Sequence, residues 1–145
     1  MVALSGAFCS VMAISHQLLL TLFPGLYAIA RFSPDQALNF DYAKSSFFSV
    51  TKTDHELSVV CVQSEVPDGV RAERDRRLLK IESVLTFSLT GVLSSIAGPL
   101  AEAAISIFAV SSFDTDYILI ADRDIEQAIA ALESVGHKIQ RSTSP

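Results

Sequence analysis

The feature that most constrains the fold is an internal repeat at an offset of sixty residues. Segment 48–60 can be laid over segment 108–120, so that Phe, Val and Asp coincide and the apolar residues at the end match throughout. The same offset places Leu18-Leu19 over Leu78-Leu79. A period of this length is typical of a duplicated domain rather than a solenoid. We therefore expect four regions, namely an N-terminal extension (1–16), a first domain (17–76), a second domain (77–141) and a tail (142–145).

Two small domains need each other. Of the 145 residues, 50% are hydrophobic and only 19% are charged, which supplies enough apolar surface for a packed core. A domain of about 60 residues buries so little surface on folding that it is only marginally stable alone. The two copies should therefore pack against each other, or against a second chain.

The second copy has clear element boundaries. Helical spacing after Thr90-Gly91 predicts one helix, and residues 125–135 predict another that stops at Gly136. Pro99 cannot donate to the carbonyl of Ser95, so we expect the first helix to be kinked or shortened. Strands are predicted at four places, which are 78–84, 105–110, 117–120 and 138–140. This βαββαβ order predicts a four-stranded antiparallel sheet with both helices on one face.

The first copy is less regular. Strands are predicted over 18–22, 26–32, 47–51 and 57–62. The capping-box order of Ser33 to Gln36 predicts a short helix through Ala37 and Leu38. The final helix is replaced by a loop at 64–68 and by the charged segment 71–77, which we interpret as a solvated helical turn or loop. The predicted fold class is thus α+β, with two ferredoxin-like domains whose antiparallel sheets carry their helices on one face.

Composition excludes several classes of function. A net charge of −5 argues against a nucleic-acid binder, because phosphate contacts need a basic face. The first thirty residues carry no charged side chain, but no positive segment precedes them and Pro24-Gly25 interrupts them, so we expect neither a signal peptide nor a membrane span. Cys9 and Cys61 lack metal-site spacing, and a buried, reduced Cys61 suits the cytoplasm.

No catalytic pattern is recognisable. The chain has no nucleophile elbow, Walker loop or dinucleotide fingerprint, and its three histidines are scattered. We therefore expect no enzyme, no cofactor and no metal. One alternative stays open, because Asp114 and Asp116 are two residues apart and could present paired carboxylates on one face of a strand.

Several segments together are similar to the ACT-domain family, in the tandem arrangement found in the CASTOR arginine sensors. The resemblance extends over residues 18–139. The segments that carry it are Leu20–Gly25, Phe47–Asp54, Glu56–Cys61, Val66–Arg74, Leu89–Leu93, Ile105–Val110 and Phe113–Leu119.

The resemblance implies a ligand site where two domains abut, because ACT domains are adaptors that bind an amino acid there. The turn before the first helix of the second copy would contribute Leu89, Thr90, Gly91 and Val92. The facing strand edge and its loop would contribute Ile107, Phe108, Ala109, Ser111, Asp114, Thr115 and Asp116. The first copy would contribute the equivalents Ser49, Val50 and Thr51, followed by Thr53 and Asp54.

Physical arguments support the same site. A helix that begins at Gly91 presents free backbone N–H groups and a positive dipole end to an α-carboxylate. Glycine also permits close approach of a ligand. Asp114 or Asp116 would receive the ammonium group and would suit a basic side chain, which makes arginine and lysine candidate ligands. Each residue also has a purely structural explanation, as a turn, hairpin or strand-end residue.

The sequence thus predicts a non-catalytic regulatory module that binds a free amino acid between ACT domains and couples it to domain or subunit association. Its partners would be that amino acid and either a second copy, in a homodimer or larger homo-oligomer, or a regulated protein. One alternative is a structural dimerisation module without a small-molecule ligand. The other is a small enzyme that uses Asp114 or Asp116.

Overall fold

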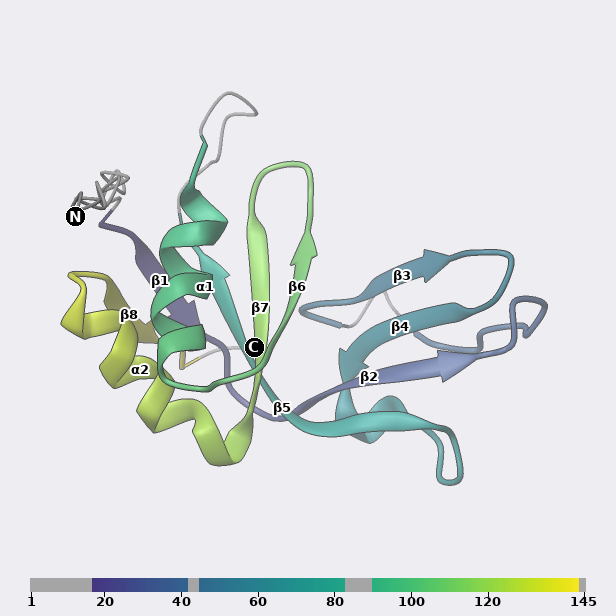
Figure 1. Ribbon diagram of the computed structural model, residues 1–145. Coiled ribbons are helices and arrows are strands. Elements are labelled where there is room, and N and C mark those ends of the chain that lie inside the picture. Colours follow the sequence, from purple (N-terminus) through teal and green to yellow (C-terminus); the bar gives the residue numbers. More distant parts are fainter. Residues whose placement is uncertain (1–16, 42–44, 83–89, 144–145) are drawn as a thin grey trace, which may run out of the picture.

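The computed structural model describes residues 17–41, 45–82 and 90–143. Over these residues the chain forms one mixed sheet of eight strands with two α-helices (Figure 1). The elements are β1 (Leu19–Leu22), β2 (Tyr27–Phe32), β3 (Ser49–Lys52), β4 (Leu57–Val62), η2 (Gln63–Glu65), β5 (Ala72–Ile81), α1 (Val92–Glu102), β6 (Ile107–Ser111), β7 (Asp116–Ala121), η3 (Asp122–Asp124), α2 (Ile125–Ser134) and β8 (Lys138–Arg141). The prediction of an α+β chain is confirmed, but the strands form a single sheet.

Strand β5 joins two regions of this sheet. Its first half pairs with β2 to give the order β3-β4-β2-β5, which we call the N-terminal sheet. Its second half lies between β7 and β1 in the order β6-β7-β5-β1-β8, which we call the C-terminal sheet. The prediction that 71–77 is a helical turn or loop is wrong. Exposed Arg71, Glu73 and Asp75 alternate with half-buried Ala72, Arg74 and Arg76, as expected where one face of a strand meets solvent.

Strand β1 lies where the sequence did not place it. It pairs antiparallel with β5 and parallel with β8. The prediction of antiparallel sheets is therefore wrong for the β1–β8 pair, which is possible because a long stretch of chain connects these two strands. β1 belongs to the predicted first domain but lies in the C-terminal sheet, and β5 runs through the predicted boundary after residue 76.

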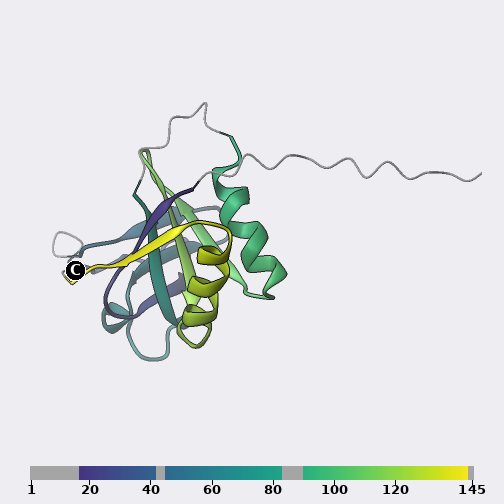
Figure 2. The same ribbon diagram turned by 90° about the vertical axis from the view of Figure 1, so that its left-hand side faces the viewer.

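The C-terminal half has the predicted β-α-β-β-α-β order. Both helices cover one face of the C-terminal sheet (Figure 2). The apolar stripes of α1 and α2 pack there on alternate residues of β5 and β7. Fully buried members of this core include Leu79, Ile81, Ile96, Leu100, Ile118, Ile120 and Leu132. The opposite face of the C-terminal sheet, which we call the helix-free face, packs Leu78 and Leu119 with Tyr27 and Val60 from the N-terminal sheet.

Helix α1 continues through Pro99 because another residue replaces the missing hydrogen bond. Pro99 has no backbone N–H to donate to the carbonyl of Ser95. This carbonyl lies 3.0 Å from Nε2 of His137 instead. The backbone N–H of Leu18 donates to Nδ1 of the same ring at 3.2 Å. Because Nδ1 accepts, Nε2 carries the proton and donates to Ser95. His137 is only 4% exposed and links α1, β1 and the start of β8.

The predicted short helix of the first copy is wrong. Residues 33–41 contain a turn, in which the Gln36 N–H donates to the Ser33 carbonyl, and then chain that forms neither helix nor strand. Leu38 and Phe40 of this stretch pack against the buried cluster that contains Val59 and Cys61. An apolar loop thus covers the N-terminal sheet where a helix was expected.

The repeat has a structural counterpart with a slightly different offset. The turn Thr53–Glu56 joins β3 to β4, and the turn Ser112–Thr115 joins β6 to β7. In each, the first residue's N–H donates to the last residue's carbonyl, at 2.9 and 2.8 Å. The equivalent turns are 59 residues apart (112 minus 53) rather than sixty. Asp114 therefore corresponds to His55 and not to Asp54, as the sequence alignment had suggested.

Candidate functional site

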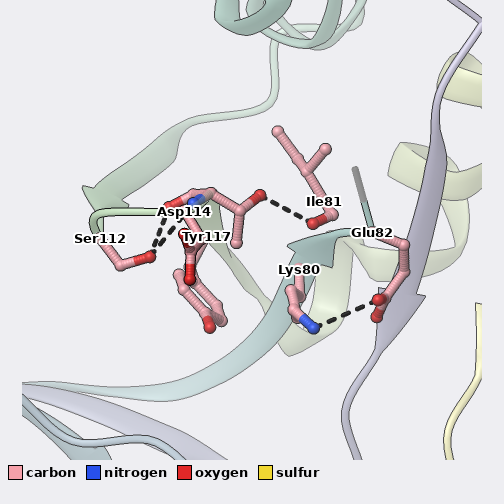
Figure 3. A pocket seen from close by; sticks show the side chains of 7 residues that line it. Lys80, Ile81, Glu82, Ser112, Asp114 and Tyr117 are labelled. Carbon is pink, nitrogen blue, oxygen red and sulfur yellow. Dashed lines mark hydrogen bonds and ion pairs between the residues drawn. The ribbon is translucent and has the colours of Figure 1, made fainter. Parts of the chain in front are cut away.

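A cavity of about 250 Å³ opens at the end of the C-terminal sheet, where β5 ends beside the β6–β7 hairpin (Figure 3). Both walls come from the same sheet but from segments thirty residues apart in the chain. The residues that line it are Lys80, Ile81, Glu82, Ser112, Asp114, Thr115 and Tyr117.

Strand register and turn hydrogen bonds hold these residues in place. Lys80 lies opposite Tyr117 of β7 on one side and Thr21 of β1 on the other. The hydroxyl of Thr115, which is 6% exposed, donates to the carbonyl of Ile81 at 2.7 Å and fastens the hairpin to β5. The Ser112 hydroxyl donates to the carbonyl of Thr115 at 2.8 Å. The cavity walls are therefore preformed.

The cavity combines charges of both signs. Nζ of Lys80 lies 3.2 Å from Oε2 of Glu82, and their side chains are 31% and 26% exposed (Figure 3). Asp114 adds a second carboxylate, on the hairpin. A hydrogen bond from Thr21 is the main cause of a lowered pKa of Glu82; burial opposes it, and the hydrogen bond and charge of Lys80 lower the pKa further. Glu82 is thus an ionised carboxylate beside an ammonium group.

The predicted site residues divide into those that line the cavity and those that lie elsewhere. Asp114 and Thr115 line it. Ser111 and Asp116 form the last pair of the β6–β7 ladder next to it. The other predicted residues of this strand lie further along β6; they are Ile107, Phe108 and Ala109.

The predicted helix turn lies at the same end of the C-terminal sheet as the hairpin (Figure 1). Thr90 and Gly91 are exposed there, whereas the side chain of Val92 is buried in the core. Gly91 precedes α1 with φ of +83°, and a Cβ added to it would meet no atom within 4 Å. The expected open approach to the helix start is therefore present. Leu89 lies outside the described residues.

The first-copy residues are not brought to this cavity. Ser49, Val50 and Thr51 lie on β3, which β4, β2 and β5 separate from β7 in the sheet order. Thr53 and Asp54 lie in the turn after β3.

Sequence reasoning missed Lys80, Glu82, Ser112 and Tyr117. Lys80 and Glu82 are the polar members of the apolar–polar alternation from Leu79 to Glu82, so the only signal for them was their charge near the end of a predicted strand. A charged residue on the otherwise apolar end of a central strand is a candidate functional residue. Tyr117 and Ser112 carried no comparable signal, since they follow the ordinary pattern of a hairpin.

Within the described parts of the chain, no group of three or more His, Cys, Asp or Glu side chains could hold a metal ion. Asp114 lines the cavity while Asp116 pairs with Ser111 in the strand ladder, so the structure gives these two carboxylates different surroundings. No helix in the described ranges is long and apolar enough to cross a membrane.

Two family models match the chain. Residues 71–134 match the ACT domain, and residues 25–69 match a model described as an N-terminal domain. The first match covers β5 to α2, and therefore the whole lining of the cavity.

Similar proteins occur in bacteria and in humans. A crystal structure of an Agobacterium tumefaciens protein is 33% identical and has a TM-score of 0.81, covering 88% of this chain and 95% of that one. The human protein CASTOR3P is 28% identical over 111 residues, which cover 68% of each chain. The regulatory subunit of aspartate kinase from Thermus flavus is 15% identical with a TM-score of 0.56, covering 80% of this chain and 95% of that one. The last of these comparisons shows a common fold only.

Proposed function

Because the chain belongs to the ACT-domain family, whose members are regulatory domains, we propose that it is a non-catalytic module that binds a free amino acid in the cavity between β5 and the β6–β7 hairpin. Ligand binding would change how its two halves, or two copies, associate.

The observation that carries this proposal is the charge pattern of the cavity. A free amino acid is a zwitterion, so its site needs a cation for the α-carboxylate and an acceptor for the α-ammonium. Lys80 supplies the first and Glu82 and Asp114 supply the second, within one cavity of about 250 Å³. Since drug-sized ligands occupy about 300–1,000 Å³, this volume suits a smaller metabolite.

The same charges favour a basic amino acid. One cation, Lys80, and two carboxylates, Glu82 and Asp114, leave the lining with a net charge of −1 (one minus two). A ligand whose α-groups are paired with Lys80 and one carboxylate leaves the other carboxylate for a cationic side chain. We therefore propose arginine or lysine as the first ligands to test.

The repeat supports two units of related topology. We propose that β2, β3, β4 and the first half of β5 form a first ferredoxin-like copy, in which loops replace the helices. The second copy consists of the second half of β5, the elements from α1 to α2, and β8, with β1 inserted between β5 and β8. The exposed helix start at Thr90-Gly91 would contribute backbone N–H groups to anion binding beside the cavity.

One observation favours the alternative of a dimerisation module. The outer edge of β6 pairs with no other strand within the described residues, and Phe108 on this strand is 38% exposed. Strand edges of this kind are templates for pairing with a second chain. This alternative predicts a stable dimer in light scattering and no response to any amino acid.

A thermal-shift screen with the twenty amino acids tests the proposal. A ligand present at a hundred times its dissociation constant should add about 2.7 kcal/mol of stability. Lys80→Met should abolish the shift, whereas Lys52→Met, which changes an exposed lysine on β3, should leave it unchanged. The absence of a shift with every amino acid at millimolar concentration would refute the proposed function.

A further inference from the structure

A residue of the first half contacts a side chain that lines the cavity. Phe47 lies in the segment before β3, and this segment runs toward the C-terminal sheet (Figure 1). Its ring packs on the ring of Tyr117, with 4.5 Å between the ring centroids and 45° between the ring planes. Tyr117 lines the cavity and lies opposite Lys80 in the β5–β7 ladder. The two halves of the chain therefore meet in an aromatic pair at the cavity.

Contacts within the first half hold Phe47 in place. Its ring makes an edge contact with the ring of Tyr27 on β2, with 6.5 Å between centroids and 76° between planes. Tyr27 is fully buried, and its hydroxyl lies 3.4 Å from the hydroxyl of Ser46. The hydroxyl of Ser45 donates to the carbonyl of Phe47 at 2.7 Å. Phe47 is thus fixed to the N-terminal sheet, while its ring rests on a strand of the C-terminal sheet.

Tyr117 belongs both to the cavity and to the packing between the two halves. Its side chain packs against the apolar cluster on the helix-free face, which contains Tyr27, Leu78 and Leu119. Beside the cavity it lies with Lys80 and Asp114 (Figure 3). Aromatic rings in tilted contact attract each other beyond the area that they bury, so Phe47 favours one orientation of the Tyr117 ring.

We propose that Phe47 is a positioning residue, which holds the Tyr117 ring in place as a wall of the cavity, so that the first half of the chain sets the affinity of the cavity for its ligand. This inference rests on the proposed function and names the contact that would couple the ligand to the association of the two halves. Because such coupling is reciprocal, a bound amino acid should also strengthen the packing of Phe47 on Tyr117.

Phe47→Leu tests this role in the full chain, with Phe48→Leu as the matched control. Leucine keeps an apolar side chain and removes the ring. Phe48 is the next residue, but its ring packs on that of Phe40, at 5.5 Å between centroids, in the cluster that contains Val59 and Cys61. The same substitution therefore disturbs two different apolar clusters, only one of which includes Tyr117.

The measurement is a dissociation constant by isothermal titration calorimetry. The ligands are arginine and lysine, or whichever of the twenty amino acids raises Tm most in the thermal-shift screen. A ligand that must itself order the Tyr117 ring loses the contribution of the aromatic pair, so binding should be about two- to tenfold weaker in Phe47→Leu. Phe48→Leu should bind like the wild type, and Phe47→Tyr, which retains a ring, should do so too.

Weaker binding in Phe47→Leu alone supports the proposal. Equal affinities in Phe47→Leu and Phe48→Leu, whether both unchanged or both reduced, overturn it and leave the proposed function standing. If the wild-type chain binds none of the twenty amino acids, the proposed function fails, and the role of Phe47 fails with it.

A measurement on the unmodified chain serves if Phe47→Leu does not fold. In aromatic NMR spectra, the ring signals of Phe47 and Tyr117 should shift together as the amino acid is added. The signals of Phe32, whose ring packs on Phe40 at 6.0 Å between centroids, should stay in place. Phe47 signals that do not move when the cavity is saturated would overturn the proposal.

Discussion

Replacement of His137 by phenylalanine tests whether the ring replaces the hydrogen bond that Pro99 removes from α1. Phenylalanine keeps the size of the buried ring but takes away both polar contacts. The Ser95 carbonyl and the Leu18 N–H then lose their partner at 3.0 and 3.2 Å. The first of these groups lies inside a packed helix and cannot turn to solvent without disturbing α1.

The expected loss follows from the cost of leaving buried polar groups unsatisfied. Each such group costs about 1–3 kcal/mol. We take the lower half of this range, because the end of β1 can admit water, and expect a total loss of about 3 kcal/mol. For a chain of this size, that corresponds to a decrease in Tm of about 6–12 °C.

Equilibrium unfolding in urea measures this loss, with His55→Phe as the matched control. His55 is exposed at the β3–β4 turn, so its replacement should change stability by less than about 0.5 kcal/mol. A double-mutant cycle adds specificity, since Pro99→Ala restores the N–H that would serve Ser95. The His137→Phe loss should therefore be about 1 kcal/mol smaller in the Pro99→Ala background. Equal losses in both backgrounds, or a loss below the control, would refute the assigned role of His137.

Three further predictions follow from the geometry. Gly91→Ala should destabilise the chain by about 1–2 kcal/mol in urea unfolding because of its φ of +83°, with no steric term, since no atom lies within 4 Å of the added carbon. Burial raises the pKa of Cys61 to about 11, and Glu65 adds to this effect, so about a thousandth of the thiol is ionised at pH 8. In a Cys9→Ser variant, the Cys61 thiol should react with a disulfide reagent only as fast as the chain opens. Because the pKa of Glu82 is lower in the folded than in the unfolded chain, the stability it contributes is complete above the usual pKa range of glutamate and is lost as pH falls through the lower folded pKa. The free energy of unfolding should therefore depend less on pH across this acid range in Glu82→Gln than in the wild type.

Elements whose cause is local could be predicted from the sequence. Strands β2 and β4 are six-residue runs with a single polar residue each, and the structure forms them at the predicted places. Helix α2 stops where Gly136 permits a positive φ, which is +97° in the structure. The predicted contribution of Asp114 and Thr115 to one site is likewise a local property, because a single turn holds both residues.

Features that depend on contacts distant in sequence could not be predicted in this way. The charged residues at 71–77 suggested a segment surrounded by solvent, but β2 and β7 pair with this part of β5 and hold it extended. The insertion of β1 left no trace in the local pattern of Leu19 to Leu22. Glu82 became part of a cavity only because the β6–β7 hairpin, thirty residues further along the chain, lies beside the end of β5.

A single pair of equivalent positions distinguishes the β6–β7 hairpin, which borders the cavity, from the β3–β4 hairpin. Arg31 lies opposite Ser58, two residues after the turn that ends at Glu56, and Lys80 lies opposite Tyr117, two residues after the turn that ends at Thr115. In the first half, Nε of Arg31 binds the Glu56 carboxylate at 2.8 Å, and its guanidinium also donates to the carbonyl of His55 at 3.2 Å, so the side chain is held against the turn. In the second half, the turn has the shorter side chain of Thr115, whose hydroxyl donates to the Ile81 carbonyl. The ammonium group of Lys80 donates to the carboxylate of Glu82. The equivalent turns thus differ: one holds an arginine–glutamate ion pair, and beside the other Lys80 and Glu82 line a cavity. Repeated topology alone therefore does not imply two ligand sites in this chain.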